Sequence, residues 1–258
     1  MNSVLRFVIA SACLVAASGC VTTNADGVVL PQKEPDLEEA ARLNTQLGVD
    51  YMRRGQNGAA LEKLKRALDQ DEQYAPAHTA IALIYADRGE HRAAEKHYRR
   101  ALSLRPDDPA VRNNFGAFLC ERGKHEAADR NFLEAARNPR YQEPAKAWLN
   151  AGVCARRVPD LKKAERYFRQ ALKIVPQSPD ALGQMAWVSL QQQDYLSARA
   201  FLQRYQQVAR MTPETLLVGY QTETALGDAR AAFAYADRLR RDFPDSKERK
   251  QLSQSSSS

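Results

Sequence analysis

The stretch from Ala41 to Ser246 repeats with a period of 34 residues, and this repetition constrains the fold more than any other feature. The eighth residue of the first five copies is glycine or alanine, and the twentieth residue of all six copies is alanine. The twenty-fourth residue of the first five copies is large and apolar. A segment of this length cannot bury its own apolar face, so we expect the copies to stack on one another. The six copies are residues 41–74, 75–108, 109–142, 145–178, 179–212 and 213–246.

Each copy predicts two antiparallel helices. Small residues at positions eight and twenty let the two backbones approach, and the large residue at position twenty-four fills the remaining space. Gly55, Gly89, Gly123 and Gly227 fall between the two helices, where a left-handed residue ends the first one. The pair Asp108-Pro109 is typical of a helix start. This pattern is typical of the tetratricopeptide repeat and predicts an all-α fold, a right-handed solenoid of six helix pairs.

Three parts of the chain depart from the period. Two extra residues, around Gln142 to Pro144, separate the third copy from the fourth and predict a local kink. The sixth copy has Gly219 where a leucine is expected, which fits the irregularity of terminal repeats. The closing residues 247–258 are charged and then rich in serine, and we expect a frayed helix end and a disordered tail.

The N-terminus predicts an exported and lipidated protein. Arg6 precedes an apolar run from Phe7 to Ala17, which indicates a signal peptide over residues 1–19. Residues 17–20, Ala-Ser-Gly-Cys, resemble a bacterial lipobox, so Cys20 is the expected lipidation site. The alternative is a simple secretory signal with a chance cysteine. By resemblance to Gram-negative sorting signals, the absence of aspartate after the cysteine favours the outer membrane, where the protein would be lipid-anchored on the periplasmic face.

Residues 20–40 predict the lipidated cysteine and a flexible tether, because they show no sustained apolar periodicity. The net charge is +7, and removal of residues 1–19 would take away one arginine. We expect no nucleic acid to meet a basic protein in the cell envelope. Anionic headgroups or acidic protein surfaces are the counterparts for this charge, although a mixed solvated surface explains it as well.

Composition and motifs argue against several classes. A hydrophobic content of 44% excludes disorder over most of the chain, and no apolar stretch after residue 20 is long enough to span a bilayer. The chain has no P-loop, no G-x-S-x-G and no H-E-x-x-H motif. His91 and Glu95 share a helix face, but His97 is turned away from them, so we expect no metal site. The sequence therefore predicts no enzyme and no cofactor other than the covalent lipid on Cys20.

Cys120 and Cys154 are the two cysteines that remain beyond residue 20. They lie 34 residues apart, late in the first helices of the third and fourth repeats, and such helices are neighbours in a stack. An oxidising compartment would allow a disulfide between them. Two buried free thiols that act as small apolar residues are the alternative.

A binding surface is the remaining expectation. In tetratricopeptide stacks the first helices line a groove. Asn114 and Asn150 occupy position six, where an amide can hold a peptide backbone, although a structural role is equally compatible. Trp187 is the expected anchor of a partner, because large aromatic side chains concentrate binding energy. The predicted groove residues are Val49, Met52, Leu83, Asn113, Asn114, Ala117, Asn150, Val153 and Trp187.

The combination of lipobox, tether and six repeats resembles the type IV pilus biogenesis/stability lipoprotein family, often called PilF or PilW. The most similar stretches are residues 113–120, NNFGAFLC, and 148–154, WLNAGVC. The resemblance covers nearly the whole chain. It implies a pilotin, which binds the type IV pilus secretin subunit and promotes its localisation or multimerisation at the outer membrane. It also implies dependence on the lipoprotein-sorting machinery.

An alternative reading is a tetratricopeptide scaffold lipoprotein that serves outer-membrane β-barrel or cell-wall assembly. The sequence does not separate the two.

Overall fold

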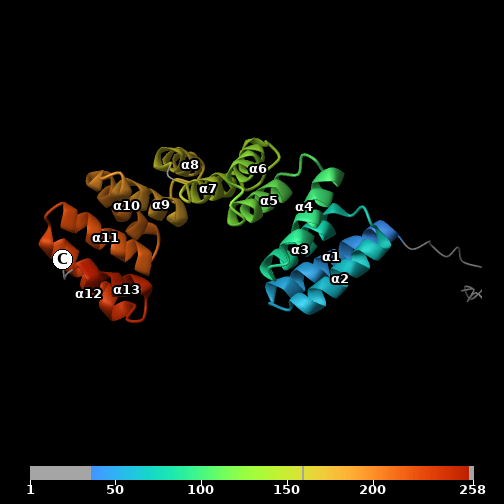
Figure 1. Ribbon diagram of the computed structural model, residues 1–258, viewed down its shortest axis with the longest axis horizontal. Helices are drawn as coiled ribbons and strands as arrows, with labels where there is room; N and C mark the ends of the chain where they lie inside the picture. The colour runs from blue at the N-terminus through green and yellow to red at the C-terminus, as the bar shows by residue number, and fades with distance from the viewer. Residues whose placement is uncertain (1–35, 159, 256–258) are drawn as a thin grey trace, which may run out of the picture. The chain divides into compact units, whose positions relative to one another are not determined.

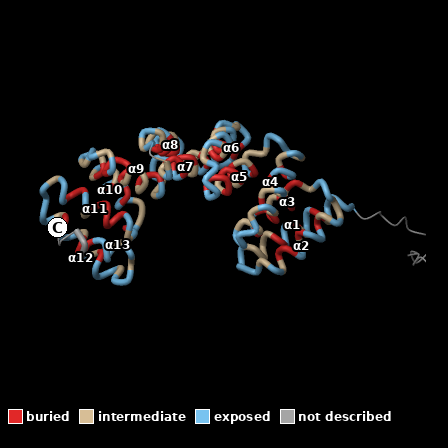
Figure 2. The backbone as a smooth tube through the Cα atoms, in the orientation of Figure 1, coloured by how far each residue is buried: buried red, intermediate tan, exposed pale blue. Residues whose placement is uncertain are grey.

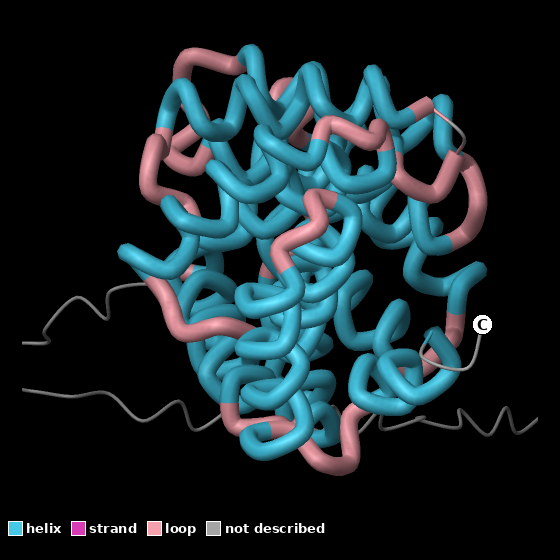
Figure 3. The backbone as a smooth tube through the Cα atoms, turned by 90° about the vertical axis from the view of Figure 1, so that its left-hand side faces the viewer, coloured by secondary structure: helices cyan, strands magenta, loops and turns pink. Residues whose placement is uncertain are grey.

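The computed structural model describes residues 36–158 and 160–255, with side chains up to residue 252, and these residues form thirteen helices and no strand (Figures 1 and 3). The predicted all-α tetratricopeptide solenoid is confirmed. The first helices of the repeats are α1 (Leu37–Arg53), α3 (Ala75–Asp87), α5 (Pro109–Glu121), α7 (Pro144–Ala155), α9 (Pro179–Gln191) and α11 (Pro213–Ala225). The second helices are α2 (Asn57–Gln70), α4 (His91–Leu104), α6 (His125–Arg137), α8 (Leu161–Ile174), α10 (Tyr195–Val208) and α12 (Ala229–Asp242). A thirteenth helix, α13 (Lys247–Ser255), follows the last pair.

The two helices of a pair pack through the predicted contact between positions eight and twenty-four. A Cβ atom added to Gly116 of α5 would lie 2.8 Å from two ring carbons of Phe132 in α6. A Cβ atom on Gly48 of α1 would lie 2.7 Å from Cγ of Leu64 in α2. Both large side chains are almost fully buried. Glycine is therefore required at these positions by close approach of the helices, and not by backbone conformation.

The four glycines that end first helices or their turns behave as predicted from the sequence. Gly55, Gly89, Gly123 and Gly227 all adopt φ between 72° and 75°. In the fifth repeat a non-glycine residue, Gln193, takes this left-handed conformation with φ of 63°. Side-chain caps start several helices, as at Asp108, which accepts hydrogen bonds from the amides of Ala110 and Val111. The turns and helix starts of the repeats thus depend on nearby residues and can be predicted from the sequence.

Successive repeats share apolar side chains instead of surrounding one central core. Tyr98 of α4 stacks on Phe115 of α5 with ring centroids 5.2 Å apart, and it also meets Phe118 at 5.5 Å. One cluster of buried side chains runs without a break from α3 to α9, and a second runs from α9 to α13. Buried segments accordingly follow the helix pairs along the chain (Figure 2). Each repeat is stabilised by its neighbours, as expected for a solenoid.

The sixth repeat keeps the small-to-large contact but moves it by one residue. Gly219 of α11, at position seven, takes the place of the usual small residue at position eight. A Cβ atom on Gly219 would lie 2.6 Å from ring carbons of Tyr235 in α12, which is at position twenty-three. Both partners have shifted in the same direction, so the pair remains in register. The sequence of this repeat departs from the pattern, but the contact between a small residue of the first helix and a large residue of the second helix is kept.

Two predicted boundaries are wrong. Residues 247–255, predicted as part of a disordered tail, form α13, and Leu252 is only 2% exposed in the second cluster. The physical reason is that the last repeat has an apolar face without a following repeat, and Leu252 covers it. Residues 37–40, predicted as tether, belong to α1, where Glu38 and Glu39 in the first turn favour the helix dipole. The predicted signal peptide and residues 20–35 of the predicted tether, Cys20 included, lie outside the described residues, as do residues 256–258.

Among the described helices, none combines the length and the apolar character that crossing a membrane requires.

A pair of histidines joins α3 to α4. The Nδ1 atoms of His78 and His97 are 2.9 Å apart, and Nε2 of His78 lies 3.1 Å from the carbonyl oxygen of Glu72. Because a carbonyl only accepts, His78 donates from Nε2, and its Nδ1 therefore accepts a hydrogen bond from the Nδ1–H group of His97. Burial, the nearby His78 and the charge of Lys96 lower the pKa of His97 to about 4. Burial also lowers the pKa of His78.

We predict that Gly116→Ala lowers the stability of the protein by about 1–3 kcal/mol, because the added methyl group would collide with the buried ring of Phe132. Gly58→Ala is the matched control, since a Cβ atom there has no neighbour within 4 Å in an exposed part of α2. The control is expected to leave stability unchanged or raise it slightly. The midpoint of urea unfolding measures both. Equal midpoints for the two variants would contradict the packing rule.

We predict that stability falls by about 1–2 kcal/mol between pH 6.5 and pH 4 on account of the histidine pair, after allowance for solvent around the partly buried rings. The pKa of His97 is lowered on folding, so the unfolded chain binds more protons in this range, and stability is lost as the pH falls. Thermal unfolding at several pH values measures the effect. His97→Gln should reduce the loss, and a variant as acid-sensitive as the parent would contradict the assignment.

Candidate partner-binding surface

The third and fourth repeats are joined covalently by a disulfide between Cys120 in α5 and Cys154 in α7. Their Sγ atoms are 2.11 Å apart and their Cα atoms 5.9 Å apart, and both residues are buried. The structure thus contains the bridge and not the pair of free thiols. Since α5 and α7 are first helices of adjacent repeats, the bridge fixes the junction that carries the two extra residues.

His125, the first residue of α6, lies beside this disulfide. Its Nδ1 atom is 3.6 Å from Sγ of Cys154 and 4.0 Å from Sγ of Cys120. These three side chains have the composition of a metal site, but sulfur atoms bonded to each other lack the thiolate charge that binds a metal. In the oxidised protein this cluster is therefore a structural feature.

The predicted groove residue Asn113 is not available to a partner. It is 2% exposed, and its Oδ1 accepts a hydrogen bond of 3.0 Å from Nδ2 of Asn150. The pair connects α5 to α7, the same two helices that the disulfide joins. The placement of Asn113 in the groove was wrong because position five of this repeat faces the neighbouring first helix. The amide of Asn150 is also engaged, which supports the structural role for it, whereas Asn114 remains partly exposed.

The other predicted groove residues differ in how far they are exposed. Leu83 in α3 and Val153 in α7 are each 37% exposed, and these are the most accessible apolar side chains of the set. Val49 and Met52 of α1 pack against a third cluster of buried residues, which runs from α1 to α3. Ala117 of α5 packs against the cluster that runs from α3 to α9. The first helices therefore present apolar side chains to solvent at a few separate points.

Trp187 is partly covered by an arginine that sequence reasoning did not single out. The guanidinium of Arg156, at the end of α7, lies 3.6 Å from the centroid of the Trp187 ring. Arg156 also donates to the side-chain oxygen of Gln184 and approaches Glu214 at 3.6 Å. Burial lowers the pKa of Arg156. The arginine links three repeats, and one face of the predicted anchor Trp187 is already occupied by a cation–π contact.

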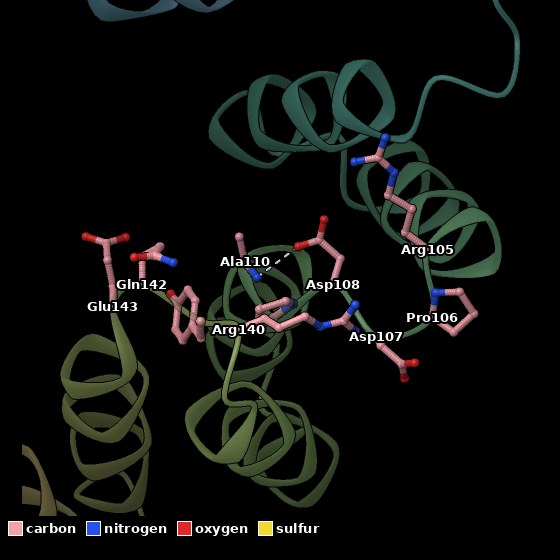
Figure 4. Close-up of a pocket in the computed structure, with 10 residues that line it drawn as sticks. Arg105, Pro106, Asp107, Asp108, Ala110, Arg140, Gln142 and Glu143 are labelled. Carbon is pink, nitrogen blue, oxygen red and sulfur yellow. Dashed lines mark hydrogen bonds between the residues drawn. The ribbon is translucent and has the colours of Figure 1, made fainter.

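A hollow of about 610 Å³ lies between the loop that joins α4 to α5 and the loop that joins α6 to α7 (Figure 4). Its wall contains Pro106, Pro109 and the buried Tyr141. Burial, with the nearby charges of Glu143 and Asp108, raises the pKa of Tyr141 to about 12. The side chain of Arg140 points from the α6–α7 loop towards Asp107, which lies in the α4–α5 loop (Figure 4). Gln142 and Glu143 line this hollow, so the two extra residues in this part of the sequence are its signal, although by themselves they predict only a kink.

These features favour a role in binding another protein over a role in catalysis. Within the described part of the chain, the candidate residues form no constellation of nucleophile, base and orienting group. The first helices offer exposed apolar side chains, and the loop hollow offers an apolar wall with charged residues around it. Such a surface can hold a segment of another protein.

Comparison with known proteins identifies the family. Tetratricopeptide repeat profiles match residues 45–109, 119–179 and 160–214. The chain is 29% identical over 234 residues to the type IV pilus assembly protein PilF of Pseudomonas aeruginosa, which covers 91% of this chain and 92% of that protein. The structure matches PilW, described as a widely conserved type IV pilus biogenesis factor, with TM-score 0.76 and 31% identity over 82% of this chain and 97% of that one. The chain belongs to the PilF/PilW family of tetratricopeptide repeat proteins.

A solved structure of Pseudomonas aeruginosa PilF is similar as well, with TM-score 0.78 and 28% identity over 85% of this chain and 99% of that chain. The likeness to PilF/PilW proteins thus extends over nearly their whole length. The predicted family is confirmed, and the chain is a tetratricopeptide protein of type IV pilus biogenesis. Its fold is typical of proteins that act by binding other proteins.

We predict that loss of the disulfide in the double variant Cys120→Ala, Cys154→Ala lowers stability by about 3–4 kcal/mol, given a closed loop of 34 residues. Thermal unfolding of this PilF/PilW protein, with and without a reductant, measures the effect. The reductant should destabilise the parent and leave the double variant unchanged. If it leaves the parent unchanged too, the bridge does not stabilise the stack.

Proposed function

We propose that the protein is a pilotin, which binds the secretin subunit of the type IV pilus and promotes its localisation or multimerisation. The observation that carries this proposal is the 31% identity to the pilus biogenesis factor PilW over 97% of that chain. A likeness of this extent covers nearly the whole of that pilus protein. The role needs binding in fixed proportion and no catalytic group.

We further propose that Cys20 carries the lipid and that the protein lies on the periplasmic face of the outer membrane. The support is the sequence of residues 1–20, which resembles a lipoprotein signal. Several acyl chains on one cysteine give stable anchoring, whereas a single chain gives marginal binding. The lipoprotein-sorting machinery would then carry the protein, with its bound secretin segment, to the outer membrane.

The first helices are the proposed contact surface for the secretin. Leu83 and Val153 are exposed apolar side chains on α3 and α7, the first helices on either side of α5. Burial of such side chains against a partner contributes roughly 25 cal/mol for each Å² removed from water. Asn114 of α5 lies partly exposed and can both donate to and accept from a peptide backbone.

We predict that the double variant Leu83→Asp, Val153→Asp reduces co-purification of the secretin at least tenfold and reduces its multimers in the outer membrane. A charge at these positions would have to be desolvated in the complex. Leu196→Asp is the matched control, because Leu196 is 68% exposed on the second helix α10. The control should leave both readouts unchanged. Quantitative blotting of membrane fractions gives the multimer level and the level of each variant.

A strain that lacks the protein separates the pilotin role from the choice of surface. Loss of outer-membrane secretin multimers in this strain is expected. If the multimers and twitching motility are normal in its absence, the pilotin role is excluded. If the strain loses its multimers but the double variant retains them, the role stands and another surface binds the secretin.

A further inference from the structure

Charge is distributed unequally between the two kinds of helix. The six second helices carry 20 lysines and arginines against 9 aspartates and glutamates. The six first helices carry 4 lysines and arginines against 8 acidic residues. The basic character of the protein therefore resides on the second helices, whereas the proposed secretin surface lies on the first helices.

Within the second helices the charge concentrates on one face. Positions 18, 22, 25 and 29 of a repeat are spaced by four, three and four residues, so they follow one side of the helix. In α4, α6 and α8 these positions hold nine cations, all exposed, and one acid, Glu126. We call these nine residues the basic face: Arg92, Lys96, Arg99, Arg130, Arg137, Lys162, Arg166, Arg169 and Lys173.

The basic face is little neutralised by the protein itself. Arg99 pairs with Glu95, and Arg169 pairs with Glu165, each through an exposed contact of 2.8 Å within its own helix. Within the described part of the chain, none of the other seven cations forms an ion pair with a carboxylate. Seven neighbouring charges of one sign repel each other in the free protein. An anionic counterpart would relieve this repulsion.

The three helices that carry the basic face are linked to one another. Lys163 of α8 pairs with Asp129 of α6 at 2.9 Å, and the hydroxyl of Tyr167 donates to the same carboxylate. Lys124, the residue before α6, pairs with Glu95 of α4 at 2.9 Å. These contacts hold Glu95 and Asp129 between neighbouring second helices. Glu126 is the one acid among the twelve positions of the face.

The same four positions on the remaining second helices are neutral. In α2, α10 and α12 they hold three cations and three acids. The basic face is therefore a property of the three central repeats and not a general feature of this repeat type. It also stops where the flanking repeats begin, as a defined contact area would.

We propose that the basic face binds a membrane surface rich in anionic phosphate headgroups. Long flexible cations spread over three helices suit a dense layer of mobile anions, because each can find a phosphate without a fixed geometry. A specific protein interface would carry buried aromatic or apolar anchors, whereas Leu133 is the only apolar residue among these twelve positions. The face would thus lie against headgroups while the first helices remain free for the secretin.

The test uses the unit of residues 36–258, which contains every described helix and excludes the proposed lipid site. We expect this unit to sediment with vesicles that contain phosphatidylglycerol and not with vesicles of phosphatidylcholine alone, and to dissociate as salt is raised. The double variant Lys162→Glu, Lys173→Glu should bind about thirtyfold more weakly, since each basic residue near an anionic surface contributes about 1 kcal/mol. No pilus component is present, so failure of the pilotin role does not affect the result.

The matched control is Arg230→Glu, Arg241→Glu, which changes the charge by the same amount at the same positions, 18 and 29, of α12. The control is expected to retain most of the binding. An equal loss of vesicle binding in the two variants would show that binding depends on net charge alone. It would overturn the basic face as the contact area. Binding to polyglutamate without binding to anionic vesicles would overturn the membrane as the partner and point to an acidic protein instead.

Discussion

Each helix pair depends on one close contact, between a residue with little or no side chain and a large apolar residue of the partner helix. Gly116 against Phe132 and Gly48 against Leu64 show how little space separates the two backbones. This approach determines which side of each helix is buried. It therefore also determines which side of the first helix and which side of the second helix face outwards. In the sixth repeat the contact survives a shift of one residue, as Gly219 against Tyr235. The contact itself, and not the position number, is what the fold requires.

The central repeats add links that the period does not require. The disulfide, the hydrogen bond from Asn150 to Asn113 and the stacking of Arg156 on Trp187 all join non-equivalent positions of neighbouring repeats. Two of the three lie at the junction where two extra residues interrupt the period. The loop that contains the extra residues lines the hollow together with Tyr141, and the covalent bridge joins α5 to α7 near their C-terminal ends. The cost of irregularity in the stack is thus offset by local cross-links.

The two sets of helices divide the surface between two kinds of interaction. First helices carry exposed apolar residues such as Leu83 and Val153 and a small excess of acid. Second helices carry the excess of cations. A solenoid permits this division because each helix has one buried side and one free side, so the free sides of the first and second helices can carry different residues. A protein built this way could contact a membrane and a partner at the same time without competition between them.

The sequence by itself determined the period, the helix pairs, and their caps and turns, because these features depend on contacts at fixed separations along the chain. It left the bridge between Cys120 and Cys154 open, and the structure decided it. Only the tertiary structure decided the burial of Asn113, the cover that Arg156 provides for Trp187, and the packing of Leu252 against the last repeat. These depend on how one repeat is rotated against the next and on what an end repeat leaves uncovered. A residue pattern records the packing within a repeat, since the same pair recurs in every copy. Contacts that occur once, between different positions of different repeats, leave no such record.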